Sequence, residues 1–86
     1  VGEEQRIRLV LLEANILRLK NHFLEAYQLL KESLELNPEH PEILYETAMM
    51  AEKNDDFDSF ERLMRKLLDL DPEHAHAYNA LGYSLL

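Results

Sequence analysis

The sequence predicts an all-α fold in which antiparallel helical hairpins stack side by side. Ala, Leu, Glu, Lys and Met, which lose little entropy in a helix, dominate the 86 residues. Only two Gly and three Pro are present, too few to punctuate a series of strands and tight hairpins. A segment of 34 residues is also repeated, and apolar residues recur three and four positions apart. These observations favour five helices.

The expected helices cover residues 4–19, 23–36, 41–53, 57–70 and 75–86. The first is apolar on almost every side, which predicts that it is covered by more than one neighbour. The second and fourth each carry one apolar stripe at helical spacing, formed by Phe23, Ala26, Tyr27, Leu30 and Leu34 and by Phe57, Phe60, Leu63, Met64, Leu67 and Leu68. Each stripe should face the partner helix of its hairpin.

The turns within the two hairpins fall at residues 20–22 and 54–56. Both contain Asn or Asp, whose short side chains suit turns and helix N-caps. Pro38 and Pro72 cannot continue a helix, so each separates one hairpin from the next.

The repeat is visible without gaps. Asn37-Pro38-Glu39-His40 returns 34 residues later as Asp71-Pro72-Glu73-His74. Laying residues 7–40 over 41–74 gives eight identities, among them Ala14 with Ala48 and Phe23 with Phe57. Self-similarity at a fixed period of this length is the signature of a helical-repeat array.

The repeated residues resemble the tetratricopeptide repeat (TPR) family, whose signature combines W-x2-L-G-x2-Y, A-x3-F and a closing Pro. The matching positions are Tyr78, Leu81, Gly82 and Leu85, then Ala26 with Leu30 and Phe60 with Met64, then Pro38 and Pro72. Glu13 departs from the pattern where the family has Leu, and Phe60 departs where it prefers Ala. The resemblance extends from about Ile7 to Leu86.

The resemblance implies a single TPR domain over residues 1–86, a right-handed superhelical α-solenoid with units at 7–40 and 41–74 and a partial unit at 75–86. Leu9, Leu12 and Ile16 would lie where a preceding unit packs, and the expected last helix would also leave apolar side chains uncovered. Arrays normally end in polar caps. We therefore expect either a fragment of a longer array or copies that self-associate through the apolar end helices.

In the family, the second, fifth, ninth and twelfth positions of each unit line a concave wall that binds a peptide or helix of a partner. These positions are Arg8, Leu11, Asn15, Arg18, Glu42, Tyr45, Met49, Glu52, His76, Asn79, Tyr83 and Leu86. We expect Tyr45, Met49 and Tyr83 to anchor the partner, because aromatic and Met side chains adapt to a surface. The same residue types at helical spacing fit a place in the core equally well.

The resemblance implies a protein-interaction scaffold and not an enzyme. A homo-oligomerisation module and a recruitment appendage of a larger enzyme are the alternatives. One TPR subclass captures the acidic tail of a chaperone with Lys, Asn and Arg side chains. This chain has Leu11, Asn15, Glu46, His76 and Ala80 at those positions. Since Glu46 would repel a carboxylate, we exclude that partner.

Charge and composition exclude several other classes. The 17 acidic and 9 basic residues give a net charge of −8, which disfavours nucleic acid and anionic membrane surfaces. No apolar run approaches the roughly 18 residues of a membrane span. The absence of Cys excludes disulfides and thiolate catalysis, and it leaves the cytoplasm and the periplasm equally open.

No residue pattern indicates a metal, a cofactor or a catalytic group. His40 and His74 occupy equivalent places near helix starts, where a polar residue is expected, and no H-E-x-x-H motif occurs. Asp55, Asp56 and Asp58 lack the Gly and Glu of a calcium loop and suit helix capping instead. Gly82 occupies the repeat position of Ala14 and Ala48, so we expect it to allow close helix packing.

Overall fold

Five α-helices joined by short turns make up residues 2–82, the part of the chain that this computed structural model describes. They are α1 (Gly2–Leu19), α2 (Phe23–Leu36), α3 (Pro41–Lys53), α4 (Phe57–Leu70) and α5 (Ala75–Leu81). No strand occurs among the described residues, so the all-α prediction is confirmed. The predicted bounds of α2, α3 and α4 agree with the structure, whereas α1 begins earlier than expected. The prediction of one helix over residues 75–86 is wrong, because α5 ends at Leu81 and Gly82 is its left-handed C-cap. Residues 83–86 of that predicted helix lie outside the described residues.

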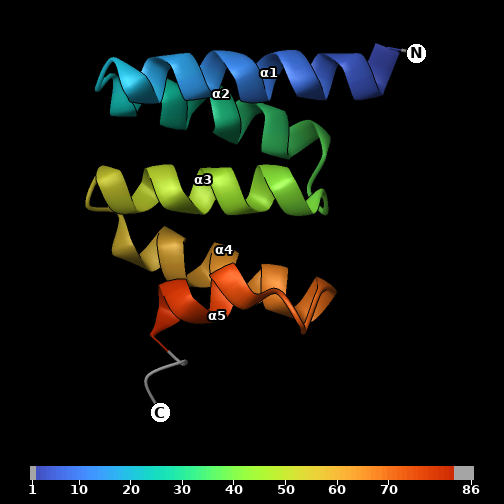
Figure 1. The fold of residues 1–86 in the computed structure, drawn as a ribbon, viewed down its shortest axis with the longest axis vertical. Coiled ribbons are helices and arrows are strands. Elements are labelled where there is room, and N and C mark those ends of the chain that lie inside the picture. Colours follow the sequence, from blue (N-terminus) through green and yellow to red (C-terminus); the bar gives the residue numbers. More distant parts are fainter. Residues whose placement is uncertain (1, 83–86) are drawn as a thin grey trace.

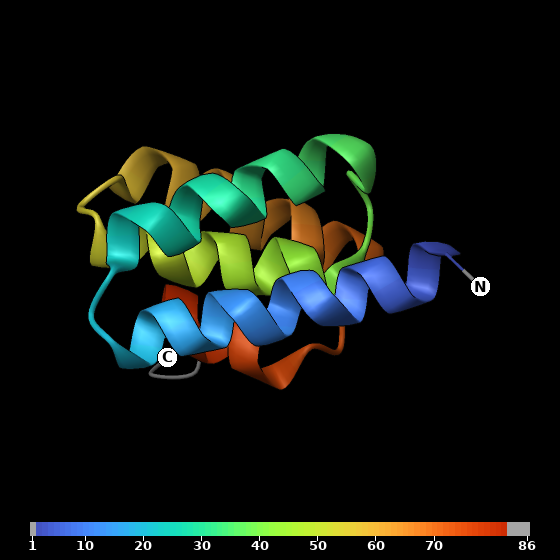
Figure 2. The ribbon, with the colours of Figure 1, turned by 90° about the horizontal axis from the view of Figure 1, so that it is seen from above.

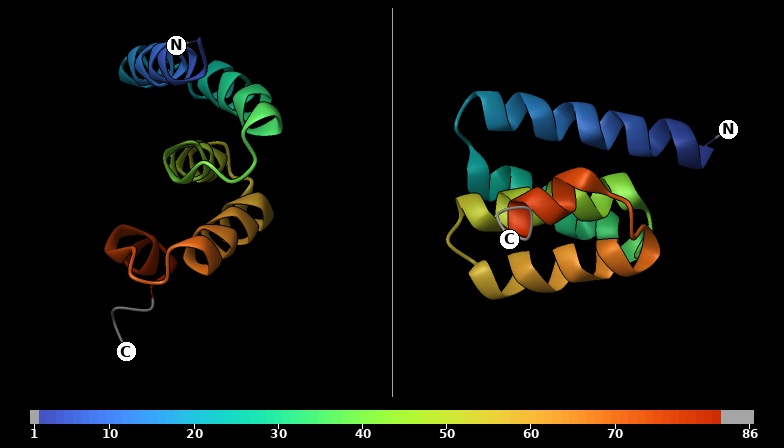
Figure 3. Two further views of the ribbon diagram at one scale, coloured as in Figure 1. Left: turned by 90° about the vertical axis from the view of Figure 1, so that its right-hand side faces the viewer. Right: turned by 60° about the horizontal axis from the view of Figure 1, so that its bottom comes forward.

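Each helix packs against the next one along the chain, and neighbours run in opposite directions (Figure 1). Seen from the side, α1, α3 and α5 form one layer and α2 and α4 form the other (Figure 3). In Figure 2 the N-terminal end of α1 extends past the ends of the other helices. This arrangement confirms the predicted stack of antiparallel hairpins, with α1–α2 as the first hairpin and α3–α4 as the second.

The turns within the two hairpins have the same geometry. Asn21 and Asp55, which are 34 residues apart, adopt left-handed backbone conformations with φ of 63° and 62°. Asn and Asp tolerate this region better than other residues with a Cβ. In both turns the following residue donates its backbone N–H to a helix carbonyl five residues earlier, His22 to Leu17 and Asp56 to Ala51, each at 2.8 Å. The two copies of the repeat therefore form turns with the same backbone conformation and hydrogen bond.

Histidine caps the helix that opens each new hairpin. The Nδ1 atom of His40 accepts a hydrogen bond from the Ile43 backbone N–H at 3.4 Å. His74 Nδ1 accepts one from the Ala77 backbone N–H at 3.1 Å. These bonds satisfy backbone donors that the first turn of a helix leaves free. The repeated His is therefore a capping residue, as its place near a helix start predicted.

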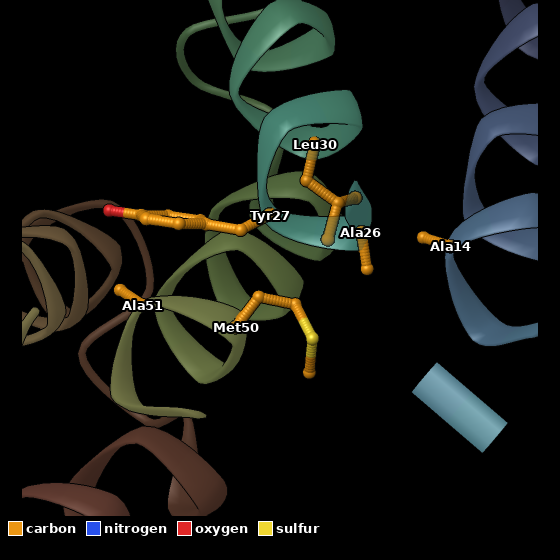
Figure 4. Close-up of a cluster of buried hydrophobic side chains, with 6 residues drawn as sticks. All are labelled: Ala14, Ala26, Tyr27, Leu30, Met50 and Ala51. Atoms are coloured by element: carbon orange, nitrogen blue, oxygen red, sulfur yellow. The ribbon is translucent and has the colours of Figure 1, made fainter. Parts of the chain in front are cut away.

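The hydrophobic core consists of two clusters that share α3. The first draws on α1, α2 and α3 and contains Ala14, Ala26, Tyr27, Leu30, Met50 and Ala51 (Figure 4). The second draws on α3, α4 and α5 and contains Leu44, Ala48, Leu63, Met64, Leu67 and Ala77. Because α3 supplies residues to both clusters, it is packed between the two halves of the stack.

Two polar contacts connect α2 to the turn that precedes α4. The Tyr27 hydroxyl donates a hydrogen bond to Asp56 Oδ2 at 2.8 Å. Asp56 Oδ1 in turn accepts from the Ser59 backbone N–H at 3.3 Å and so caps α4. Asn54 Nδ2 donates to the Phe23 carbonyl at 3.0 Å. These contacts fix how the second hairpin sits on the first.

The predicted role of Gly82 in close helix packing is wrong. A Cβ placed on Gly82 would meet no atom of the described structure within 4 Å. Instead, Gly82 is the C-cap of α5 and has a left-handed φ of 82°. Glycine adopts that conformation without a steric cost, which is why it commonly ends helices.

Candidate functional site

A hollow of about 330 Å³ lies between α1 and α3 in the layer that also contains α5. Its lining residues are Arg18, Tyr45, Glu46, Met49, Met50 and Lys53. Tyr45, Met49 and Lys53 are four residues apart along α3, which places them in one row on the same helix face. Arg18, in the last turn of α1, supplies the opposite side.

Tyr45 and Met49 belong to both the core and the hollow. Both side chains are half-buried. Tyr45 packs against the second core cluster, and Met49 packs against both clusters. The two interpretations left open by the sequence are therefore compatible, since one side of each residue fills the core and the other lines the hollow. Each of the two side chains is therefore partly packed in the core and partly open to solvent.

Glu46 places a carboxyl group among the apolar and cationic side chains of the hollow. Burial raises the pKa of its carboxyl above the ordinary value, the charge of Arg18 partly opposes that shift, and Glu42 adds to it. Burial also raises the pKa of the Tyr45 hydroxyl, with further contributions from Glu46 and Glu52. The hollow thus combines an apolar floor with one partly desolvated carboxylate and two cations, Arg18 and Lys53.

Three rings form a small aromatic group next to the hollow. The Tyr45 ring stacks on the His74 ring, with centroids 5.5 Å apart and an interplanar angle of 28°. His76 lies 6.2 Å from Tyr45 and 6.1 Å from His74, measured between ring centroids. Because His74 also caps α5, this group connects the exposed side of α3 to the start of α5.

The structure brings together only some of the residues that the sequence placed on the concave wall. Arg18, Tyr45 and Met49 line the hollow, and His76 joins Tyr45 in the aromatic group. The others that are described lie outside the hollow. Leu11 packs against the first core cluster, and Arg8, Asn15, Glu42, Glu52 and Asn79 are exposed. Arg18 Nη2 donates a hydrogen bond to Asn15 Oδ1. Tyr83 and Leu86 lie outside the described residues.

The family positions missed Met50, Lys53 and His74, and they included Glu46 only as an argument against a chaperone tail. Lys53 had a signal in the sequence, because it follows Met49 by one helical turn. The place of Met50 and His74 depends on how α1 and α5 pack against α3. No spacing within a single helix contains that information.

The repeat length, the helix order and the two-layer stack are those of one known family, and comparison with known proteins agrees. A family model described as a tetratricopeptide repeat matches residues 17–82. The chain belongs to the TPR family. It is also 38% identical over 79 residues to a TPR repeat-containing protein of Pseudomonas aeruginosa. That alignment covers 92% of this chain and 13% of the relative, so the chain spans only a small part of the relative's length.

Membership of the TPR family makes this chain a protein–protein interaction module, a class that is generally non-catalytic. Within residues 2–82, no three or more His, Asp or Glu side chains are grouped in a way that could hold a metal ion. No helix in that part of the chain has the length and apolar character needed to cross a membrane.

Proposed function

We propose that the chain binds an extended peptide or a helix of a protein partner on the concave face of the stack, with the hollow between α1 and α3 at its centre. The observation that carries the proposal is the half-buried state of Tyr45 and Met49 on the floor of the hollow. Anchors already fixed by core packing lose little conformational entropy when a partner binds.

The lining favours a partner that places an apolar side chain between polar neighbours. Tyr45 and Met49 offer apolar contact, whereas Arg18, Glu46 and Lys53 surround them with charges of both signs. Residues at the centre of an interface carry most of the binding energy, and a polar rim contributes orientation. The net charge of −8 supports a protein partner over a nucleic acid, which would be repelled.

The remaining wall residues, Arg8, Leu11, Asn15, Glu42, Glu52, His76, Asn79 and Tyr83, belong to the proposal as contacts along the length of the bound segment. We propose that the chain contributes binding and not catalysis. A larger protein containing it would then owe any chemical activity to other segments.

The test uses peptides selected from a phage-displayed library against the 86-residue chain. Tyr45→Ala and Met49→Ala should each weaken the selected peptides by about 30-fold, the size of a hot-spot loss. The matched controls are Phe57→Ala and Leu24→Ala, which change exposed apolar residues of α4 and α2 in the other layer. Circular dichroism should show that all four variants keep the fold.

Binding that survives both hollow variants but is lost in either control would move the site to the α2–α4 layer. Equal small losses in all four variants would mean that the selected peptides recognise apolar surface without a defined site.

A further inference from the structure

The three charged side chains that line the hollow between α1 and α3 differ in what holds them. Arg18 Nη2 donates a hydrogen bond to Asn15 Oδ1 on the same helix. Lys53 Nζ lies 5.6 Å from the centroid of the Phe23 ring, which is the range of a cation–π contact. Both cations of the hollow therefore have a partner within this chain.

The third charged side chain, Glu46, has no such partner. It is half-buried in the hollow that Tyr45 and Met49 also line, and within residues 2–82 it accepts no hydrogen bond and forms no ion pair. Burial is the main cause that raises the pKa of this carboxyl, and the charge of Arg18 only partly opposes it. The folded chain therefore stabilises the ionised form of Glu46 less well than water does.

Neighbouring carboxylates make the surroundings of Glu46 more negative. Glu42, one helical turn earlier on α3, raises the pKa of Glu46 further. Glu52 acts on the Tyr45 hydroxyl in the same direction. Lys53 is seven residues after Glu46, about 10 Å further along the helix axis. A cation that enters the hollow beside Glu46 would therefore be attracted by more than one carboxylate.

We propose that the hollow selects a basic apolar segment, in which an apolar side chain contacts Tyr45 and Met49 and an adjacent Lys or Arg pairs with Glu46. This inference rests on the proposed function, because it names the chemistry of the segment that binds at the same site. The added cation would donate a charge-assisted hydrogen bond to the carboxylate and replace water that burial has removed. Glu46 is then the residue that determines specificity, whereas Tyr45 and Met49 contact any apolar side chain.

An acidic segment is the alternative that the two cations of the hollow would attract. Arg18 and Lys53 are both exposed, so solvent weakens the attraction that they offer a carboxylate. The same carboxylate would approach the half-buried Glu46, where like charges oppose binding. The arrangement of charges therefore favours the basic segment over the acidic one.

The first experiment selects peptides from a phage-displayed library on the 86-residue chain and, in parallel, on Glu46→Gln, which removes the charge and keeps the size of the side chain. Peptides retained by the unmodified chain should carry Lys or Arg beside an apolar residue, and Glu46→Gln should lose this enrichment. The matched control is Glu35→Gln, which removes an exposed carboxylate from α2 in the other layer and changes the net charge equally. It should keep the enrichment.

A double-mutant cycle on one selected peptide then measures the pairing directly. Replacing the basic residue of the peptide by Gln should weaken its binding to the 86-residue chain by about tenfold at low salt, and its binding to Glu46→Gln by less than about twofold. Arg18→Gln should strengthen binding of the original peptide by about twofold, because it removes a like charge from the neighbourhood of Glu46. Calorimetric titration measures all of these affinities, and the change in the peptide tests the contact without altering the fold.

The outcomes separate the role of Glu46 from the proposed binding site. Peptides that need Tyr45 and Met49 but show no basic enrichment, or the same enrichment on Glu46→Gln, would overturn the role of Glu46 and keep the hollow as the site. An enrichment that Glu35→Gln also loses would assign the preference to net charge and overturn it equally. Peptides whose binding is indifferent to Tyr45→Ala and Met49→Ala would contradict the proposed function, and this inference with it.

Discussion

Two helices of this chain, α1 and α3, occupy equivalent places in the repeat and have opposite surroundings. α3 lies between α2 and α4 and supplies residues to both core clusters, whereas α1 packs mainly against α2, contacts α3 only slightly and belongs to one cluster. Leu9 and Ile43 are both aliphatic, but Leu9 is 66% exposed whereas Ile43 is 0% exposed. In a helical-repeat stack, burial is therefore decided by which helices are adjacent and not by residue type alone.

The second helix of the second hairpin is also capped and packed more completely than that of the first hairpin. Asp56 caps α4 through its side chain, whereas His22, at the same place before α2, makes no side-chain cap. Leu67 is a fully buried core residue of α4, and its counterpart in α2 is the smaller Ser33. Ser33 lines a hollow of about 140 Å³ together with Ile7, Val10 and Leu29. The two hairpins thus share one architecture but differ in core packing and in the capping of their second helices.

The largest expected difference in stability is between alanine substitutions at Ile43 and at Leu9, which occupy the same repeat position. Ile43→Ala should lower the free energy of unfolding by about 2–5 kcal/mol, because it opens a cavity in a fully packed site. Leu9→Ala should change it by less than about 0.5 kcal/mol in the 86-residue chain, as expected for a surface position. Urea unfolding followed by circular dichroism measures both. Equal losses would mean that α1 is covered in solution and would end the contrast between α1 and α3.

A larger side chain in the hollow beside Ser33 should make the packing of the first hairpin more like that of the second. Ser33→Leu should raise the free energy of unfolding by about 1–2 kcal/mol, because the added methyl groups are buried in the hollow beside Val10 and Leu29. Gln28→Leu, an exposed position on the same helix, serves as the control for helix propensity and should add little. A loss of stability in the first variant, with no change in the control, would show that the hollow has no room for the larger side chain.

Acid should weaken the hydrogen bond between Tyr27 of the first hairpin and Asp56 of the second. The Tyr27 hydroxyl and the Ser59 backbone hold the pKa of Asp56 below its ordinary value. A depressed carboxyl pKa contributes stability above about pH 4, and this is lost as pH falls through the lowered value. Tyr27→Phe should therefore reduce the slope of stability against pH in that range.

The acid experiment has to be separated from the effects of two other titratable groups, the Tyr45 hydroxyl and the Glu46 carboxyl. Tyr45→Phe should leave the slope unchanged, because the Tyr45 hydroxyl has no contact with Asp56 in the described structure. Glu46 acts with the opposite sign, since its pKa is raised and its contribution is lost as pH rises. It is present in every variant and cancels in the comparison. An unaltered slope in Tyr27→Phe would exclude the hydroxyl as the cause.

The smallest expected effect comes from adding the missing cap. His22→Asp should stabilise the chain by about 0.5 kcal/mol, because Asp accepts a hydrogen bond from the first turn of α2 and favours the positive end of that helix. The exposed contact between His22 and Glu25, 3.1 Å long, contributes little and its loss should not matter. Thermal unfolding with Asp56→Ala as the reciprocal variant checks the result, and a lower melting temperature for His22→Asp would contradict it.

Local features of the molecule could be predicted from the sequence because they depend on neighbouring residues. Helices α2, α3 and α4 begin and end where Pro, Asn, Asp and the apolar spacing indicated. Of the residues that the family positions place on the concave wall, Arg18, Tyr45 and Met49 line the candidate hollow, whereas the partly buried Leu11 packs against the first core cluster. Gly82 ended a helix and did not serve close packing, because its backbone conformation was not visible in the repeat.

The amino-acid sequence by itself determined the repeat, the five helices, the turns and the family, since each rests on periods, caps and backbone preferences within a few residues. Only the tertiary structure decided that Glu46, Lys53 and Met50 share a hollow with Arg18, that His74 stacks on Tyr45, and that Leu9, Leu12 and Ile16 of α1 stay exposed. These facts depend on the angle and distance at which one hairpin packs on the next. Packing of side chains from different helices sets that angle, and no period within one helix encodes it.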